Sequence, residues 1–321
     1  SHKCMYVGGV CVVSSSSSVS MGLLQNLHLV SARQIASALK AQELTSVDVV
    51  NYFIERIQTL DASINSVVCR DFERALITAE RADAQLADGM HVGPLHGVPI
   101  TVTESLDVQG LPTTYGLSKS DPVAMDCPAV ANIKAAGAII LGKTNTAAGN
   151  TDWQSYNGIY GTTNNPWDVT RTCGGSSGGS AAAVVSGLSP LDVGMGVGGS
   201  IQIPAHFCGV FGHKATHGVI PTTQPTPDMT SIGPLANSAD DLMFLLETLS
   251  DKTPTRQPML ALPNKSLSLA DFRVAIWLDA PGCNNQFSVD EKTREALELI
   301  TRGLRVEGVS VETSARPISV C

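Results

Sequence analysis

Apolar residues recur at three- and four-residue steps along the first third of the chain, which is the period of amphipathic helices. Ser31 and Ser46 each precede such a stretch, and a serine in this position is a typical helix N-cap. A third helix is expected over 71–88, because Gly89 follows it as a C-terminal glycine should. The apolar positions that define the three helices are Ile35, Ala38, Leu39, Val47, Val50, Ile54, Ile57, Phe72, Leu76, Ala79 and Leu86.

Short apolar, β-branched runs alternate with the helical stretches and predict strands. The expected strands are 66–69, 98–103, 138–141, 191–193 and 272–278, and the other expected helices are 127–137, 181–185, 239–249 and 290–304. The segment 142–146 is expected to be a turn. Ser238 is expected to cap the helix that follows it, which carries a leucine stripe typical of a packed core. The alternation predicts an α/β fold, with a mixed, twisted central sheet flanked by helices.

Composition and charge exclude some classes of function. The chain has 321 residues, of which 43% are hydrophobic, and this is enough for one large α/β domain or two modest ones. A net charge of −8 and an isoelectric point near 5.3 argue against a nucleic-acid surface, which needs a basic face. No run of like charges indicates an interaction tail.

Residues 1–29 differ from the rest of the chain. A nine-residue apolar run over 5–13 precedes five consecutive serines. This run is too short to span a bilayer as a helix, and no other segment reaches that length. We expect a disordered tail or tag here, with a targeting-like segment as the alternative. A single domain is expected to fill 30–321.

The eight cysteines are scattered and form no Cys-x-x-Cys pair. In a chain of this length, the pattern favours reduced, packed thiols over a disulfide framework or a zinc site. We therefore expect no metal or cofactor and a cytoplasmic protein. The apolar run near the N-terminus leaves a secreted protein as the alternative.

Two Gly-Ser clusters, at 174–180 and 196–200, contain the candidate chemistry. Glycines permit tight turns close to a ligand, and a packed helix is expected to start at the first cluster. The consecutive backbone N–H groups of Val197, Gly198, Gly199 and Ser200 suit a developing oxyanion. A flexible linker is the alternative for such clusters, but an apolar, Ala-rich run follows the first one. A P-loop does not fit, because no Gly-Lys-Ser/Thr follows the glycines.

These clusters, whose serines Ser176 and Ser200 lie 24 residues apart, resemble the signature of the amidase signature family. The resemblance extends from about residue 30 to 250 and includes the sequence motifs at 93–116, 152–157 and 161–168. It implies that Ser200 is the nucleophile, that residues 197–200 form the oxyanion hole, and that Ser176 is a bridging serine held by a cis peptide bond. We expect Gly174, Gly175 and Ser177 to contact the substrate. Family members continue beyond the position of Cys321, so the domain is expected to be incomplete at its C-terminus.

The chain departs from the family at Thr103, where members carry the lysine of a Ser-Ser-Lys triad. A hydroxyl does not accept a proton near neutral pH as a desolvated amine does. Gly196 stands at a familiar Asp and Gln202 at a familiar Arg, so a charged pair has lost both partners. The other departures are Cys173 and Ala215 at positions of Pro and Asn237 at a position of Arg.

Other side chains of the chain could act as the base. A serine and a histidine suffice for nucleophilic catalysis when they hydrogen-bond. The candidates are His206, His213, Lys143 and Lys214, with Asp192 or Asp168 as the acid of a triad.

We therefore expect an amidase-type hydrolase that converts a small or aryl carboxamide to carboxylate and ammonia through an acyl-enzyme on Ser200. Its activity is expected to be impaired, since Thr103 replaces the lysine. The alternatives are a pseudoamidase that binds without turnover and an amidotransferase A-type subunit. The expected partner is a small amide, and a homodimer remains open.

Overall fold

A computed structural model of the protein describes residues 5–7, 10–12, 23–222, 229–250, 268–276 and 289–313. The chain divides into two compact units, Ser1–Pro258 and Met259–Cys321. In the second unit β13 (Arg273–Ala275) pairs in parallel with β14 (Ser310–Glu312), and helix α9 (Glu291–Val306) precedes β14. The single domain expected over 30–321 stays a prediction.

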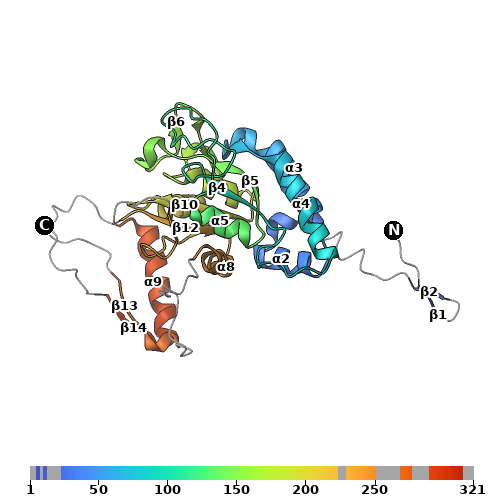
Figure 1. Ribbon diagram of the computed structural model, residues 1–321. Coiled ribbons are helices and arrows are strands. Elements are labelled where there is room, and N and C mark those ends of the chain that lie inside the picture. Colours follow the sequence, from blue (N-terminus) through green and yellow to red (C-terminus); the bar gives the residue numbers. More distant parts are fainter. Residues whose placement is uncertain are drawn as a thin grey trace. The chain divides into compact units, whose positions relative to one another are not determined.

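The first unit is built on a six-stranded mixed sheet with the strand order β11-β12-β10-β4-β5-β3 (Figure 1). Strands β10, β4 and β5 are parallel, whereas β12, β11 and β3 each run antiparallel to the neighbour they pair with. The strands are β3 (Val67–Arg70), β4 (Pro99–Thr103), β5 (Ile139–Thr144), β10 (Leu191–Gly196), β11 (Phe211–Gly212) and β12 (Ser231–Ala236). The expected mixed central sheet is confirmed.

Helices flank this sheet, as predicted. Helix α6 packs against β4, β5 and β10, while α3 packs on α4, and α5 on α8 (Figure 1). The helices of the unit are α2 (Ala32–Lys40), α3 (Ser46–Leu60), α4 (Phe72–Ala87), α5 (Pro128–Ala135), α6 (Gly178–Val185), α7 (Gln202–Cys208) and α8 (Ala239–Leu249). Among the helices of the described part, none has the length and apolar character needed to cross a membrane.

Small elements complete the first unit. The short 3-10 helices are η1 (Leu27–Leu29), η2 (Asp61–Ser63) and η3 (Ala148–Asn150). The short antiparallel pairs are β1 (Met5–Val7) with β2 (Val10–Val12), β6 (Tyr156–Asn157) with β7 (Gly161–Thr162), and β8 (Asn164–Asn165) with β9 (Asp168–Thr172). Leu27, within the segment expected to be a tail, is fully buried.

The capping signals held at two helices and failed at one. Ser31 accepts a hydrogen bond from the N–H of Gln34, and Ser238 caps α8 in the same way. The cap expected at Ser46 was wrong by one residue, because Thr45 accepts the bond from the N–H of Asp48 at 3.0 Å. Ser46 is the first residue of the helix and is buried.

Two strands are longer than the apolar pattern indicated. The expected turn at 142–146 was wrong in its first part, because Lys143 and Thr144 pair with Val102 and Thr103 and continue β5. Strand β10 likewise runs on to Gly196. Glycine and polar residues extend these strands because ladder hydrogen bonds satisfy their backbone groups on both sides. Residues 277–278 of the last expected strand lie outside the described residues.

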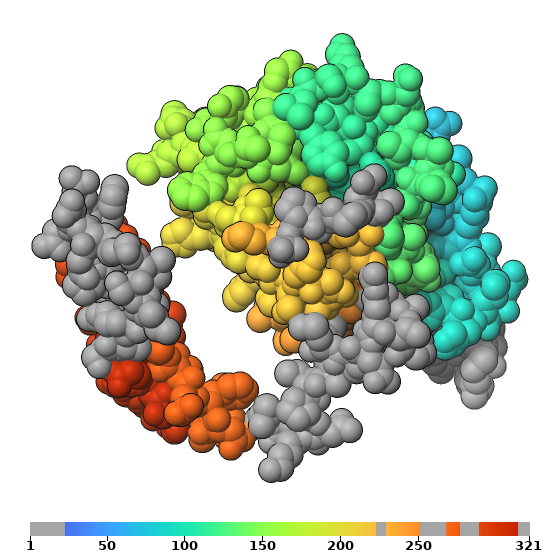
Figure 2. Space-filling view, turned by 60° about the vertical axis from the view of Figure 1, so that its left-hand side comes forward, coloured from blue at the N-terminus to red at the C-terminus, as the bar shows by residue number. Residues whose placement is uncertain are grey.

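Segments that are distant in the sequence meet in the first unit. The space-filling view shows green residues of the middle of the chain directly against yellow residues that follow the first serine cluster (Figure 2). The core of the described residues includes Phe53, Ile100, Leu141, Leu188 and Leu235, each of which is fully buried.

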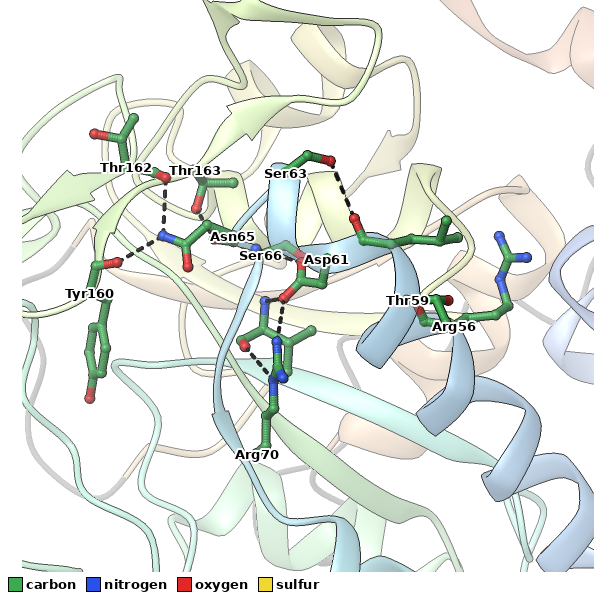
Figure 3. A network of polar contacts seen from close by, with 12 residues as sticks. Arg56, Thr59, Asp61, Ser63, Asn65, Ser66, Arg70, Tyr160, Thr162 and Thr163 are labelled. Carbon is green, nitrogen blue, oxygen red and sulfur yellow. Dashed lines mark hydrogen bonds and ion pairs between the residues drawn. The ribbon is translucent and has the colours of Figure 1, made fainter.

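A polar network connects the start of β3 to the loop at 160–163 (Figure 3). The buried carboxylate of Asp61 accepts hydrogen bonds from Ser66 N and Oγ at 2.8 and 2.5 Å and from Val67 N at 3.0 Å. Asn65 donates from Nδ2 to the carbonyls of Tyr160 and Thr162 at 2.8 and 3.1 Å. The start of β3 is therefore tied both to the end of α3 and to the loop at 160–163.

We expect Asp61→Ala to lower the free energy of unfolding by about 2–4 kcal/mol, because it leaves two buried N–H groups and one hydroxyl without an acceptor. Urea denaturation followed by circular dichroism measures the change. Asp88→Ala at an exposed helix end is the control and is expected to change stability by less than about 0.5 kcal/mol. An equal effect of both substitutions would contradict the role given to the network.

Candidate active site

The first serine cluster forms a tight, buried turn before α6. The peptide bond between Gly175 and Ser176 is cis, as the resemblance implied. Gly174 has φ of 82°, a backbone angle that glycine adopts without strain and other residues resist. Gly175 has no room for a side chain, because a Cβ there would lie 2.6 Å from the carbonyl oxygen of Asp152. The Ser176 carbonyl accepts hydrogen bonds from Ser155 Oγ at 2.8 Å, Thr146 Oγ1 at 3.0 Å and Ala147 N at 3.1 Å.

Ser177 joins the first cluster to the second. Its backbone N–H donates to the carbonyl of Ser200 at 3.1 Å. Its hydroxyl donates to Met195 O at 3.1 Å and accepts from Met195 N at 3.3 Å. Ser177 is fully buried, so these bonds attach the turn to the end of β10. The contact of Gly174, Gly175 and Ser177 with a substrate stays a prediction.

The second cluster is the turn between β10 and α7. Gly198 and Gly199 have φ of 69° and 104°, which glycine adopts without strain. Ser200 is buried, and its hydroxyl donates to the carbonyl of Val197 at 3.1 Å. The backbone N–H groups of 197–200 donate to no acceptor in the described part of the chain. The turn therefore presents a row of free donors, which is what an oxyanion requires.

The hydroxyls of Thr103 and Ser176 are buried, and neither has a hydrogen-bond partner among the described residues. A buried polar group without a partner is costly. The hydroxyl of Ser200 is bonded to Val197 and not to Ser176. The side chains at the three triad positions, Thr103, Ser176 and Ser200, are therefore not hydrogen-bonded to one another.

Asp192 lies on the same face of the sheet as Thr103. Its carboxylate accepts hydrogen bonds from Thr101 Oγ1 at 2.6 Å and Thr144 Oγ1 at 3.1 Å, and Thr144 is in turn bonded to Ser180 of α6. Complete burial raises the pKa of Asp192 to about 6, although these hydrogen bonds oppose the shift. The carboxylate joins β4, β5, β10 and α6 and contacts no histidine among the described residues.

Lys143 lies on the opposite face of the sheet from Thr103. It pairs with Val102, and side chains alternate between the faces along a strand. Its ammonium donates to Pro112 O at 2.5 Å and Thr113 Oγ1 at 2.9 Å. Burial lowers the pKa of Lys143 below its usual value, although the neighbouring Glu104 carboxylate opposes the shift. Glu104, which the sequence analysis missed, is buried and accepts from Thr114 N at 2.6 Å.

The other candidate bases are also bonded elsewhere or exposed. Lys214 donates to the carbonyl of Ala215 at 2.9 Å. His206 and His213 are exposed, and neither hydrogen-bonds to Ser176 or Ser200. Asp168 bonds to Thr170 and Arg171. Across the residues that the structure describes, no group of three or more His, Cys, Asp or Glu side chains could hold a metal ion.

Comparison with known proteins decides the family. The family model described as Amidase matches residues 48–320. The chain belongs to the amidase signature family. It is 35% identical over 303 residues to fatty-acid amide hydrolase 2-B of Danio rerio. This match covers 89% of this chain and 57% of that protein. It is 38% identical over 235 residues to indoleacetamide hydrolase of Bradyrhizobium diazoefficiens, which covers 70% of this chain and 45% of that protein.

Solved structures of the family share the fold. The TM-score to 6-aminohexanoate cyclic dimer hydrolase in complex with its substrate is 0.76 at 28% identity, over 91% of this chain and 61% of that one. The TM-score to fatty acid amide hydrolase is 0.81 at 24% identity, over 94% of this chain and 55% of that one, and this likeness shows the fold alone. The chain spans about half the length of the curated relatives it matches.

The structure accounts for one departure from the family pattern. A Cβ on Gly196 would lie 2.2 Å from Cβ of Ser200, so Ser200 occupies space that a side chain at position 196 would need. Gln202, at the position of the familiar Arg, is exposed. The loss of both charged groups therefore leaves no unpaired buried charge at this turn.

The pKa of Asp192 predicts a pH dependence of stability. A carboxyl whose pKa is raised by folding contributes stability that is complete below its unfolded pKa, about 3.9, and is lost as pH rises through the folded value. We expect the free energy of unfolding to fall by up to about 3 kcal/mol between about pH 4 and 7. Asp192→Asn removes this loss, as urea midpoints across the range will show. Parallel pH profiles of the two proteins would contradict it.

We expect Gly196→Ala to displace Ser200, because the new methyl group and the Ser200 side chain cannot occupy the same space. The rate of Ser200 labelling by a fluorophosphonate should fall on the order of 100-fold, as for other displacements of about 1 Å in reacting groups. Gly158→Ala is the control, because a Cβ there meets nothing within 4 Å. Unchanged labelling of Gly196→Ala would show that Ser200 does not depend on this space.

Proposed function

We propose that the protein hydrolyses carboxamides through an acyl-enzyme on Ser200. The observation that supports this most is the junction of the two serine clusters, in which the Ser177 N–H reaches the Ser200 carbonyl at 3.1 Å. Ser200 is buried at this junction and is the last residue of the row 197–200, whose backbone N–H groups donate to no acceptor among the described residues. The known amide hydrolases among the relatives give independent support, since their printed names include fatty-acid amide hydrolase, indoleacetamide hydrolase and acylamidase.

The reaction has two stages. Ser200 Oγ attacks the amide carbonyl, and its proton passes to Ser176, whose own proton passes to the leaving nitrogen as the C–N bond breaks. The N–H groups of 197–200 hold the oxyanion. Water then attacks the ester on Ser200, so that the carboxylate leaves and the serine regains its proton. For this relay the Ser200 hydroxyl must turn from the Val197 carbonyl toward the Ser176 hydroxyl, which has no hydrogen-bond partner among the described residues.

Thr103 limits this relay. Its hydroxyl does not accept a proton near neutral pH, so a water molecule must take the place of the family lysine. Lys143 does not replace it, because its ammonium lies on the other face of the sheet and is bonded to Pro112 and Thr113. We therefore propose a slow amidase. The cytoplasmic location and the homodimer stay predictions.

Ammonia release from a panel of simple and aryl amides tests the proposal. We expect slow release by the unaltered chain, none by Ser200→Ala, and an increase of about 10²- to 10⁴-fold in Thr103→Lys, the usual contribution of a positioned acid or base. Ser176→Ala should remove the gain that Thr103→Lys brings.

Each alternative has its own outcome in this assay. Amide binding without ammonia release by any variant would favour a pseudoamidase and contradict turnover. Release that needs a partner subunit would favour an amidotransferase subunit. Release that survives in Ser200→Ala would exclude Ser200 as the nucleophile.

A further inference from the structure

The segment 152–155 contacts both serine clusters. Ser155 Oγ donates to Ser176 O and accepts from Gly178 N, each at 2.8 Å. The indole N–H of Trp153 donates to the carbonyl of Gly198 at 3.1 Å. Gly175 packs against the backbone of the same segment, since a Cβ there would lie 2.6 Å from Gln154 N. No part of this arrangement is used in the chemistry proposed above.

Trp153 differs from its neighbours in exposure. Ser155 and Ser200 are buried, whereas the Trp153 side chain is 63% exposed. A tryptophan combines a large apolar surface with one polar group, and here the polar group is satisfied by the Gly198 carbonyl. The ring is therefore fixed at its nitrogen and presents apolar surface to solvent.

The ring lies beside the row of free N–H groups. Gly198 is two residues before Ser200. The carbonyl of the neighbouring Val197 accepts a hydrogen bond from the Ser200 hydroxyl, and Val197 is 41% exposed. A carbonyl held by the N–H groups of 197–200 would place one of its two substituents near Val197 and Trp153. Both side chains offer apolar surface to that substituent.

We propose that Trp153 is a specificity-determining residue, which selects amides with an aromatic or large apolar substituent on the reacting carbonyl. Such a substituent packs on the exposed face of the indole and removes apolar surface from water on both sides. The proposal rests on the proposed function in one respect, that the substrate carbonyl lies at Ser200. The gain or loss of an apolar contact between a substrate and the protein changes affinity by about tenfold or more.

The chain contains a matched control for this role. Trp167 is 73% exposed, and its indole N–H donates to the carbonyl of Cys208 at 2.7 Å. It thus has the same side chain, similar exposure and the same kind of bond, but it contacts α7 at the end opposite to Ser200. Trp167→Ala therefore reports what the loss of an exposed indole does without involving the serine clusters.

The test measures binding, so that it does not depend on turnover. Calorimetry gives the dissociation constants of 1-naphthaleneacetamide and acetamide for Ser200→Ala alone and combined with Trp153→Ala, Trp153→Phe or Trp167→Ala. We expect Ser200→Ala to bind 1-naphthaleneacetamide more tightly than acetamide. Trp153→Ala should weaken it about tenfold with little effect on acetamide, and Trp153→Phe, which keeps a ring without the N–H, should weaken it less. Trp167→Ala should leave both constants unchanged.

Three results would overturn the proposal. The first is equal affinity for the naphthyl amide with and without Trp153. The second is an equal loss of affinity for both amides in Trp153→Ala, which indicates that Trp153 only positions the Gly198 turn. The third is that none of the variants binds the naphthyl amide. Fluorophosphonate labelling of Ser200 in the unaltered chain is measured separately. Loss of labelling with retained Trp153-dependent binding would contradict the proposed function and not this inference.

Discussion

The candidate site depends on one constraint, which is that Ser177 attaches two separate turns to each other. Its N–H reaches the Ser200 carbonyl and its hydroxyl bonds both backbone groups of Met195, all within a fully buried environment. Gly174 follows from this constraint, because a Cβ there would lie 2.7 Å from Cα of Pro204, in the helix that follows the second turn. A single buried serine thus sets the distance between the two serines to which we assign the chemistry.

The sheet separates two sets of buried polar groups. One face carries Asp192 with its threonine partners and Thr103, whose hydroxyl has no partner among the described residues, and it is covered by α6. The other face carries Lys143 and Glu104. Side chains alternate between the faces of a sheet, and Lys143 pairs with Val102 while Thr144 pairs with Thr103, so Lys143 cannot reach the face of Thr103 without a shift of β5. This separation is the physical reason for our proposal that Lys143 does not replace the family lysine at position 103.

Much of this architecture could be predicted from local patterns. The helices after Ser31 and Ser238 and the two Gly-Ser clusters are contiguous signals, and each was found at its place. Ladder partners cannot be seen in a local window, and this is why β5 was predicted to end before Lys143. The contacts of Trp153 with Gly198 and of Ser155 with Ser176 are also tertiary. The family resemblance includes residues 152–157, but no pattern in them shows which side chain turns inward and which stays exposed.

The central claim is that Ser200 reacts while the N–H groups of 197–200 hold the oxyanion. A crystal structure of the protein soaked with phenylboronic acid tests it most directly, because boronic acids form tetrahedral adducts with reactive serines. The account predicts a bond between boron and Ser200 Oγ, with one boronate oxygen within about 2.7–3.1 Å of at least two of these N–H groups. A boronate bound to another residue, or one bonded to Ser200 but turned away from the N–H groups, would contradict it.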